Sequence, residues 1–198
     1  MRGLEQIPWI YDLGLAIAER GGFGRWRRWL PGGARGRTLD LGTGTGRNLP
    51  WLPPGARAIA VDPHAENLRA ARARAPGIPL VRARAEALPF PDATFDTVLS
   101  GLVFCSVDDP ATGLAEVRRI LRPGGSLRML EHVRASGRLA GWLQDLVQPP
   151  WTWVTGGCRP NRPTERTVAA AGFELDPGER RGGGTMRRFT ARPRDGVR

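Results

Sequence analysis

The stretch "LDLGTGTGRN", residues 39–48, places three glycines within five positions, directly after an apolar run that ends at Asp40. Glycine has no Cβ atom, so the backbone of such a loop can approach a ligand closely, and a helix that follows offers free amide groups. In doubly wound sheets, ligands bind at turns of this kind, at the carboxyl end of the first strand. The stretch therefore predicts a cofactor-binding turn, with a dinucleotide and S-adenosylmethionine as the two candidate ligands.

Strands and helices alternate around this loop. Strands are predicted at 37–41, 57–62 and 78–83, within 94–104 and at 126–132, with helices over 64–75 and 109–121. A helix is also expected from Gly46 until Pro53 and Pro54 stop it. The tail adds a tryptophan-rich helix and loop at 138–157, another helix and two late strands. This order predicts the α/β fold class: a Rossmann-like, seven-stranded sheet, mostly parallel with its last strand antiparallel, and helices on both faces.

A carboxylate at Asp62 strengthens the cofactor prediction. Asp62 ends the second predicted strand, 20 residues after Gly42, where an acidic side chain binds both hydroxyls of a ribose. The alternative is that Asp62, followed by Pro63, caps the next helix. The third glycine, Gly46, comes one position earlier than in the G-x-G-x-x-G loop of nicotinamide-binding proteins, which weighs against a dinucleotide.

With Asp40 two positions before the first glycine, the segment D-L-G-T-G-T-G (40–46) resembles motif I of class I S-adenosylmethionine-dependent methyltransferases. Two later segments are similar to the same family: "AEALPFPDATFDTVLS" (85–100) to its post-adenine segment and fourth strand, and "EVRRILRPGGSLRMLEH" (116–132) to its helix, turn and fifth strand. The resemblance, to members with a methyltransferase type 11 domain, implies S-adenosylmethionine as the cofactor and S-adenosylhomocysteine as the product.

The resemblance also implies which residues bind the cofactor. The methionine end is expected at Asp40 and the loop after it, the ribose at the end of the second strand, the adenine after the third strand, and the sulfonium after the fourth. The residues implied are Asp40, Gly42, Thr43, Gly44, Asp62, Pro63, Ala85, Glu86, Ser100 and Gly101. Many relatives carry an Asp before that Ala, whereas this chain has Arg84, so Glu86 is the expected substitute at the adenine.

A narrower resemblance concerns the methyl acceptor. Residues 35–175 are similar to the small methyltransferase-like thiol S-methyltransferases, and related sequences include phospholipid N-methyltransferases and quinone C-methyltransferases. The matching residues are Cys105, Ser106, Glu131, His132, Val133, Pro149, Trp151, Gly157, Cys158 and Arg162. The resemblance implies methyl transfer to a small, apolar acceptor, with a thiol slightly favoured over a phospholipid amine or a quinone-like carbon. An RNA methyltransferase, a hydride-transferring enzyme and a non-catalytic cofactor-binding protein are less favoured alternatives.

Few side chains are available as a base, which methyl transfer needs only for a protonated acceptor such as a thiol. His132, at the end of the fifth predicted strand, is the candidate, with structural hydrogen bonding as the alternative. Four residues are candidates for the substrate side: Tyr11, Asp12, Phe104 and Trp151. The two cysteines give no disulfide framework, and no third ligand accompanies them in the sequence, so no metal is expected. Cys105 is expected to pack as a small hydrophobe and Cys158 to be more exposed.

The 198 residues are expected to form one domain. We predict an N-terminal helical lid (1–34), a cofactor-binding core (35–132), a substrate-side helix and loop with the last strands (133–193), and a frayed tail (194–198).

The net charge of +11 comes from arginine without lysine and is widely spread, which indicates a basic, solvated surface; nucleic acid is therefore disfavoured as a partner. The seven tryptophans, some beside arginines, leave peripheral contact with an anionic membrane open. No apolar stretch approaches the ~20 residues of a membrane span, so a cytoplasmic location is expected. The sequence does not indicate an oligomeric state.

Overall fold

A single mixed sheet organises the chain in the computed structural model, which describes residues 8–18, 20 and 23–194. The strands are β1 (Arg37–Leu41), β2 (Arg57–Asp62), β3 (Leu80–Arg82), β4 (Phe95–Gly101), β5 (Leu121–His132), β6 (Phe173–Leu175), β7 (Arg181–Gly183) and β8 (Met186–Pro193). The helices are α1 (Pro8–Ala18), α2 (Gly24–Gly32), α3 (Ala65–Arg74), α4 (Pro110–Ile120), α5 (Arg138–Thr155) and α6 (Thr164–Ala170), with a 3-10 turn, η3 (Leu49–Trp51).

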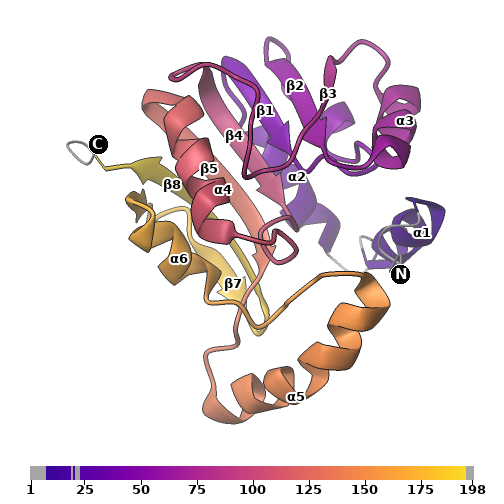
Figure 1. Ribbon diagram of the computed structural model, residues 1–198, viewed down its shortest axis with the longest axis vertical. Helices are drawn as coiled ribbons and strands as arrows, with labels where there is room; N and C mark the ends of the chain where they lie inside the picture. Colours follow the sequence, from indigo (N-terminus) through magenta and orange to yellow (C-terminus); the bar gives the residue numbers. More distant parts are fainter. Residues whose placement is uncertain (1–7, 19, 21–22, 195–198) are drawn as a thin grey trace.

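The strand order is β3-β2-β1-β4-β5-β8-β6 (Figure 1). The first five strands in this order run parallel, whereas β8 is antiparallel to both β5 and β6. The predicted mostly parallel sheet with an antiparallel last strand is therefore confirmed. The predicted strand count of seven is wrong, because the sheet has eight strands. The additional strand, β7, is a short segment that folds back through the glycines at 182–184 and pairs with β8.

Two local predictions also needed correction. The helix expected from Gly46 is only the 3-10 turn η3, because Pro50 stands in its first turn and prolines at 53 and 54 follow at once. The turn expected at 122–125 lies within β5, where the pairing with β4 shifts register between Phe95 and Thr97. The extra residues form a bulge that β5 absorbs without ending.

Apolar side chains alternate across the sheet and bury both of its faces. Figure 1 shows α4 and α6 in front of the sheet and α2 behind it. Val98 and Met129 belong to the core on the α4 side, whereas their neighbours Leu99 and Leu130 pack with Leu30 of α2 on the other side. This period of two follows from the pleat of a strand. The prediction of helices on both faces is therefore confirmed.

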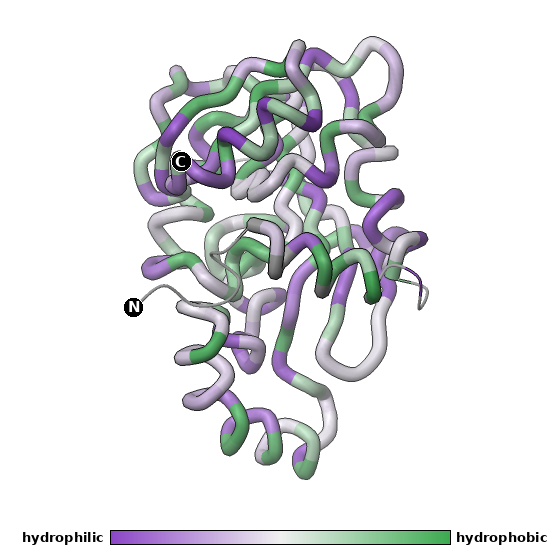
Figure 2. The backbone as a smooth tube through the Cα atoms, turned by 90° about the vertical axis from the view of Figure 1, so that its right-hand side faces the viewer, coloured by the Kyte–Doolittle hydropathy of each residue, from purple (hydrophilic) through white to green (hydrophobic). Residues whose placement is uncertain are grey.

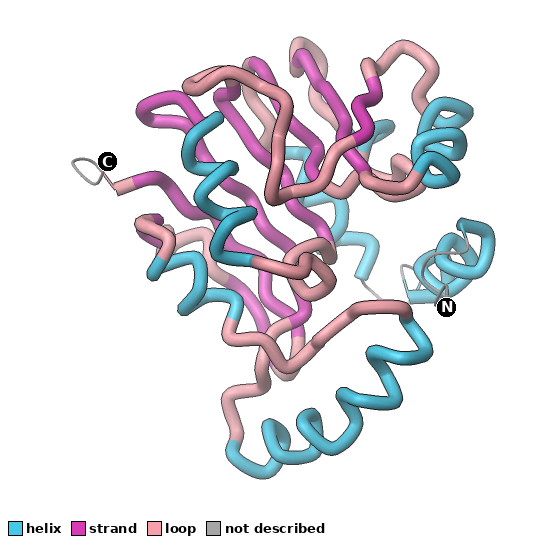
Figure 3. The backbone as a smooth tube through the Cα atoms, in the orientation of Figure 1, coloured by secondary structure: helices cyan, strands magenta, loops and turns pink. Residues whose placement is uncertain are grey.

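The helix α5 stands apart from these layers. It lies beyond the edge where the parallel strands end, and loops at both of its ends join it to the body (Figure 3). Figure 2 shows hydrophobic positions recurring along it at the lower end of the molecule. None of the helices in the described part of the chain is long and apolar enough to cross a bilayer.

The glycine loop after β1 requires a residue without a side chain at position 46. Its φ is +79°, and a Cβ atom there would lie 2.9 Å from the Cα atom of Ala71 in α3. Gly55 has a similar φ of +89° but no atom within 4 Å of such a Cβ. We expect Gly46→Ala to lower the free energy of unfolding by about 1 to 3 kcal/mol more than the matched control Gly55→Ala, because α3 must also move. Urea denaturation of both variants measures this difference; equal losses would contradict the packing argument.

Candidate functional site

A cavity of about 360 Å³ lies at the carboxyl ends of the parallel strands. Its walls come from the glycine loop after β1, from the segments that follow β2, β3 and β4, and from the turn after α5. The lining residues used below are Gly42, Gly44, Asp62, Pro63, His64, Asn67, Arg84, Ala85, Glu86, Gly101, Leu102, Val103, Ser106, Asp108, Gly156 and Gly157. Seven of the ten residues expected at the cofactor line this cavity; Asp40, Thr43 and Ser100 do not.

The carboxylate of Asp40 is fully buried beneath the loop and does not line the cavity. Its Oδ2 accepts a hydrogen bond from Thr43 Oγ1 at 2.6 Å, and its Oδ1 accepts one from Asn48 Nδ2 at 2.9 Å. Burial raises the pKa of Asp40, and these hydrogen bonds and the charge of Arg27 offset the rise in part. Asp40 and Thr43 therefore hold the loop from behind, whereas Gly42 and Gly44 face the cavity.

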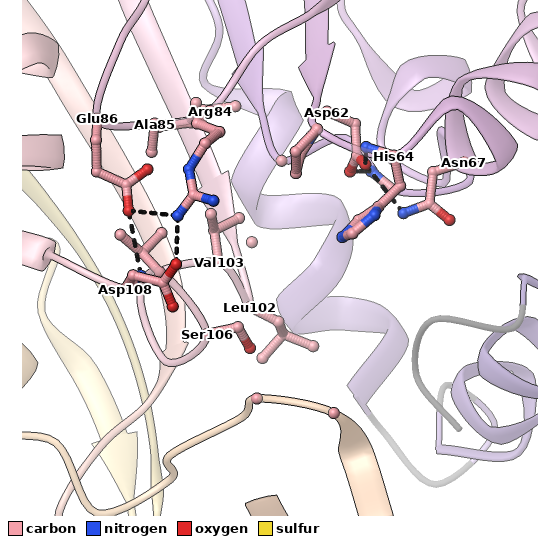
Figure 4. Close-up of a pocket in the computed structure, with 18 of the residues that line it drawn as sticks. Asp62, His64, Asn67, Arg84, Ala85, Glu86, Leu102, Val103, Ser106 and Asp108 are labelled. Atoms are coloured by element: carbon pink, nitrogen blue, oxygen red, sulfur yellow. Dashed lines mark hydrogen bonds and ion pairs between the residues drawn. The ribbon is translucent and has the colours of Figure 1, made fainter. Parts of the chain in front are cut away.

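Asp62 fixes the start of the next helix, which was the alternative role, and its binding of the ribose stays a prediction. Its Oδ1 accepts hydrogen bonds from the His64 amide at 2.9 Å and from Asn67 Nδ2 at 3.1 Å, which fixes the start of α3. Its Oδ2 accepts the Gly44 amide at 2.9 Å, which ties the glycine loop to the end of β2. The same carboxylate lines the cavity (Figure 4), and its oxygens can accept further hydrogen bonds.

Arg84, which replaces the acidic residue of many relatives, closes one end of the cavity with two carboxylates. Its guanidinium is hydrogen-bonded to Asp108 and forms an ion pair with Glu86 at 3.5 Å (Figure 4). Glu86 Oε1 also accepts the amides of Asp108 and Asp109, at 3.2 and 3.3 Å. Burial alone would raise the pKa of Glu86, but hydrogen bonds from its own amide and the Asp109 amide, together with Arg84, outweigh it and lower that pKa. Glu86 thus holds the loop after β4, and its expected contact with adenine stays a prediction.

A second buried acid, Glu131, shapes the loop that follows β4. Its Oε1 accepts hydrogen bonds from Ser100 Oγ at 2.8 Å, from the Val103 amide at 3.0 Å and from the Phe104 amide at 3.2 Å. Burial raises the pKa of Glu131 to about 7. The bend also forces a φ of +62° on Leu102, a strained value for a residue with a side chain. Ser100 lies buried behind Gly101, which faces the cavity.

The sequence gave Glu131 no role, although it stands beside His132. Ser100 and Glu131 lie near the carboxyl ends of paired strands, so their side chains meet only once the register of β4 and β5 is known. Two signals in the sequence pointed to it: it is a polar residue within an apolar strand, and it is among the residues that match the thiol S-methyltransferases.

His132 does not line the cavity but lies beside both cysteines. Its Nδ1 is 3.6 Å from Cys158 Sγ, and the ligand atoms of Cys105, His132 and Cys158 all lie within 4.8 Å of one another. Hydrogen bonding with Cys105, and then with His132, lowers the pKa of Cys158, whereas the pKa of the buried Cys105 is raised. Cys105 is buried as expected, but Cys158 is only 1% exposed, so its predicted exposure is wrong. The expectation that no third ligand accompanies the cysteines is also wrong.

Three of the four residues expected on the substrate side, Asp12, Phe104 and Trp151, do not line this cavity. Asp12 instead joins α1 to the body, because its carboxylate accepts hydrogen bonds from Thr45 Oγ1 at 2.6 Å and from Arg74 Nη2 at 2.7 Å. Phe104 is buried in the core, and Trp151 is 40% exposed on α5. The side chain of Tyr11 lies outside the described part of the structure. The turn after α5 contributes Gly156 and Gly157 to the cavity wall in their place.

Three features of this structure define the class I methyltransferase architecture. They are a parallel sheet with one inserted antiparallel strand, a glycine loop after β1 and an acidic residue at the end of β2. In agreement, the methyltransferase domain family matches residues 39–129. Human thiol S-methyltransferase TMT1A is 30% identical to the chain over 176 residues, which cover 83% of this chain and 70% of that protein. The chain therefore belongs to the S-adenosylmethionine-dependent methyltransferase family.

Other relatives differ in the acceptor that their names specify. Human thiol S-methyltransferase TMT1B is 36% identical over 158 residues, covering 71% of this chain and 62% of that protein. Demethylmenaquinone methyltransferase of Renibacterium salmoninarum is 34% identical over 126 residues, covering 61% of this chain and 53% of that protein. The chain thus spans less than two thirds of the length of these two relatives.

A solved structure supports the fold. The S-adenosylmethionine-dependent methyltransferase from Mesorhizobium loti has a TM-score of 0.67 and 20% sequence identity, covering 86% of this chain and 96% of that one.

The position of Asp62 predicts a loss of cofactor affinity on its substitution. We expect Asp62→Asn to weaken S-adenosylhomocysteine binding at least tenfold, about 1.4 kcal/mol, because charge-assisted hydrogen bonds to the ribose hydroxyls are lost. Isothermal titration calorimetry measures this affinity. Asp92→Asn is the matched control, because Asp92 is an exposed carboxylate outside the cavity wall. Equal affinities of the two variants would exclude Asp62 as a ribose ligand.

Proposed function

We propose that this protein transfers the methyl group of S-adenosylmethionine to a small, apolar acceptor, with a thiol favoured, and releases S-adenosylhomocysteine. The observation that carries the proposal is the composition of the cavity wall. One side is made of the loops that follow β1, β2 and β3, and the other side includes the turn after α5, which stands beside Cys158. The cavity therefore offers a cofactor side and a separate acceptor side.

In this proposal the cofactor follows the ends of the strands. Its amino-acid part lies against Gly42 and Gly44, its ribose against Asp62 and Pro63, and its adenine against Ala85, with the sulfonium next to Gly101. Asp40, Thr43 and Ser100 act from behind the wall, because they are buried and fix the loops that carry the contact residues.

The transfer itself is an in-line displacement that depends on alignment and on the exclusion of water. A thiol must first lose its proton, since the thiolate is the nucleophile and an unperturbed thiol has a pKa of about 8.5. The thiolate sulfur then bonds to the methyl carbon, and the electron pair of the broken carbon–sulfur bond stays on S-adenosylhomocysteine. His132 is the candidate base, since it stands beside Cys158, the residue after Gly157 of the cavity wall.

The similarity to two thiol S-methyltransferases supports a thiol acceptor, and the similarity to a quinone methyltransferase keeps a quinone-like carbon as the second candidate. A phospholipid amine is the third. All three share the same cofactor chemistry, because the fold fixes the cofactor site and leaves the acceptor to the loops around it.

The acceptor is tested with isotopically labelled S-adenosylmethionine. We expect benzyl mercaptan to give labelled methyl thioether in an amount equal to the S-adenosylhomocysteine formed, whereas the matched alcohol, benzyl alcohol, gives none because it does not ionise near neutral pH. Mass spectrometry measures both products. Methylation of a demethylmenaquinone or of phosphatidylethanolamine, with none of the thiol, would replace the acceptor class. Cofactor binding without any methylation would favour a non-catalytic protein.

The helix α5 has its polar side toward the body and its apolar side toward solvent. Gln144 is hydrogen-bonded to Ala135, Val133 and Pro160 of the body, and Asp145 forms an ion pair with Arg134 at 2.6 Å. The opposite face carries a stripe of large apolar side chains that are 39–71% exposed: Leu139, Trp142, Leu143, Leu146, Val147, Trp151, Trp153 and Val154. α1 adds Trp9, Leu13 and Ile17, each more than half exposed.

We propose that this stripe rests on an anionic membrane surface, from which an apolar acceptor would reach the cavity. Large apolar patches on a protein surface mark interaction sites, and the net charge of +11 favours a negatively charged surface.

Vesicle co-sedimentation tests whether the protein binds an anionic membrane surface. We expect the protein to sediment with phosphatidylglycerol-containing vesicles at low salt, and Trp153→Glu to reduce the bound fraction to the level seen with neutral phosphatidylcholine vesicles. Trp51→Glu is the matched control, since Trp51 is 50% exposed on η3, outside α1 and α5. Equal binding of both variants, or no binding at all, would contradict the proposal.

A further inference from the structure

Three segments that are distant in sequence bring two thiols and an imidazole together. Cys105 lies in the loop after β4, His132 ends β5, and Cys158 follows α5. Their ligand atoms lie within 4.8 Å of one another, and each cysteine is only 1% exposed. The proposed methyl transfer uses at most the imidazole of His132, so the two buried thiols have no role in it.

We propose that Cys105, His132 and Cys158 bind a zinc ion, and that this ion holds the sulfur of the acceptor thiol during methyl transfer. The second half of the proposal rests on the proposed thiol methylation. Two cysteines and one histidine are a ligand set that catalytic zinc sites use, with the fourth position left for a water or a substrate.

The distances fit a tetrahedral ion. Zinc–sulfur bonds of about 2.3 Å and zinc–nitrogen bonds of about 2.0–2.1 Å imply a sulfur–nitrogen separation of about 3.6 Å. The distance from Cys158 Sγ to His132 Nδ1 is 3.6 Å. The upper limit of 4.8 Å on the other separations leaves only a small side-chain movement to reach tetrahedral spacing.

The backbone around the cluster is held in place by its own hydrogen bonds. The Arg159 amide donates to the Cys105 carbonyl at 2.8 Å, so the two cysteine segments are joined directly. Thr152 Oγ1 donates to the Cys158 carbonyl at 2.8 Å, and Arg162 Nη1 donates to the Phe104 carbonyl at 2.6 Å. Sites whose supporting shell is fixed in this way bind metals without a large ordering cost.

The neighbours of the two cysteines place the fourth position near the cavity. Ser106 follows Cys105, Gly157 precedes Cys158, and both of these neighbours line the cavity.

The chemistry balances without an oxidant or a reductant. The acceptor thiol binds through sulfur and releases its proton to solvent, since coordination deprotonates a thiol at neutral pH. Its electron pair forms the bond to the methyl carbon, while the bond between that carbon and the sulfonium breaks and its pair stays on S-adenosylhomocysteine. The neutral thioether is a weaker ligand and leaves. His132 then acts as a ligand and not as the base.

Cobalt substitution tests the site, because the sequence holds only two cysteines and two histidines. We expect titration of the metal-free protein with Co²⁺ to give a thiolate-to-cobalt charge-transfer band and tetrahedral d–d bands that saturate at one ion per chain. Cys158→Ser and His132→Gln should each weaken binding by more than about 100-fold, whereas the matched control His64→Gln should not. Circular dichroism and S-adenosylhomocysteine calorimetry show whether each variant is folded.

Addition of benzyl mercaptan to the cobalt protein should strengthen the charge-transfer band, and benzyl alcohol should leave it unchanged. The absence of thiolate bands, or equal affinity in folded Cys158→Ser and His132→Gln, would overturn the metal site even if the thiol is methylated. Bands that do not respond to benzyl mercaptan would overturn the acceptor's place on the ion. Bands that do respond, in a protein that methylates no thiol, would support the site and count against the proposed function alone.

Discussion

The buried carboxylate of Asp40 is the constraint on which the site depends. It stands at the end of the central strand β1 and accepts hydrogen bonds from Thr43 and Asn48, while Arg27 of α2 donates to Asn48 at 3.2 Å. An ion in the interior persists only if such partners surround it. The glycine loop is therefore held to the sheet from behind, and its backbone faces the cavity with no side chain of its own.

Other acidic side chains along this edge of the sheet also hold loops in place. Asp62 accepts the Gly44 amide, Glu86 accepts the amides that precede α4, and Glu131 accepts two amides of the loop after β4. Each acid fixes a loop that follows a different strand, so the walls of the cavity support one another. A site built in this way is organised before its ligand arrives.

The proposed acceptor side is built differently. Its turn and Cys158 come after α5, a helix whose polar residues anchor it to the body while its apolar stripe faces outward. The chain is similar to relatives named for thiols and for quinones, which agrees with a fold that fixes the cofactor site and leaves the acceptor to the loops around it.

The sequence by itself determined the mostly parallel sheet, the loop at 42–46 and the place of Asp62, because glycine spacing and the alternation of strands with helices can be read along the chain. It missed the β7 hairpin, which has too little apolar pattern to show, and it did not predict the hydrogen bond by which Asp12 joins α1 to the body. Only tertiary structure brought Glu131 to the loop after β4 and Cys158 to His132, 26 residues away. Such contacts depend on strand register and on where α5 returns the chain, which no local pattern encodes.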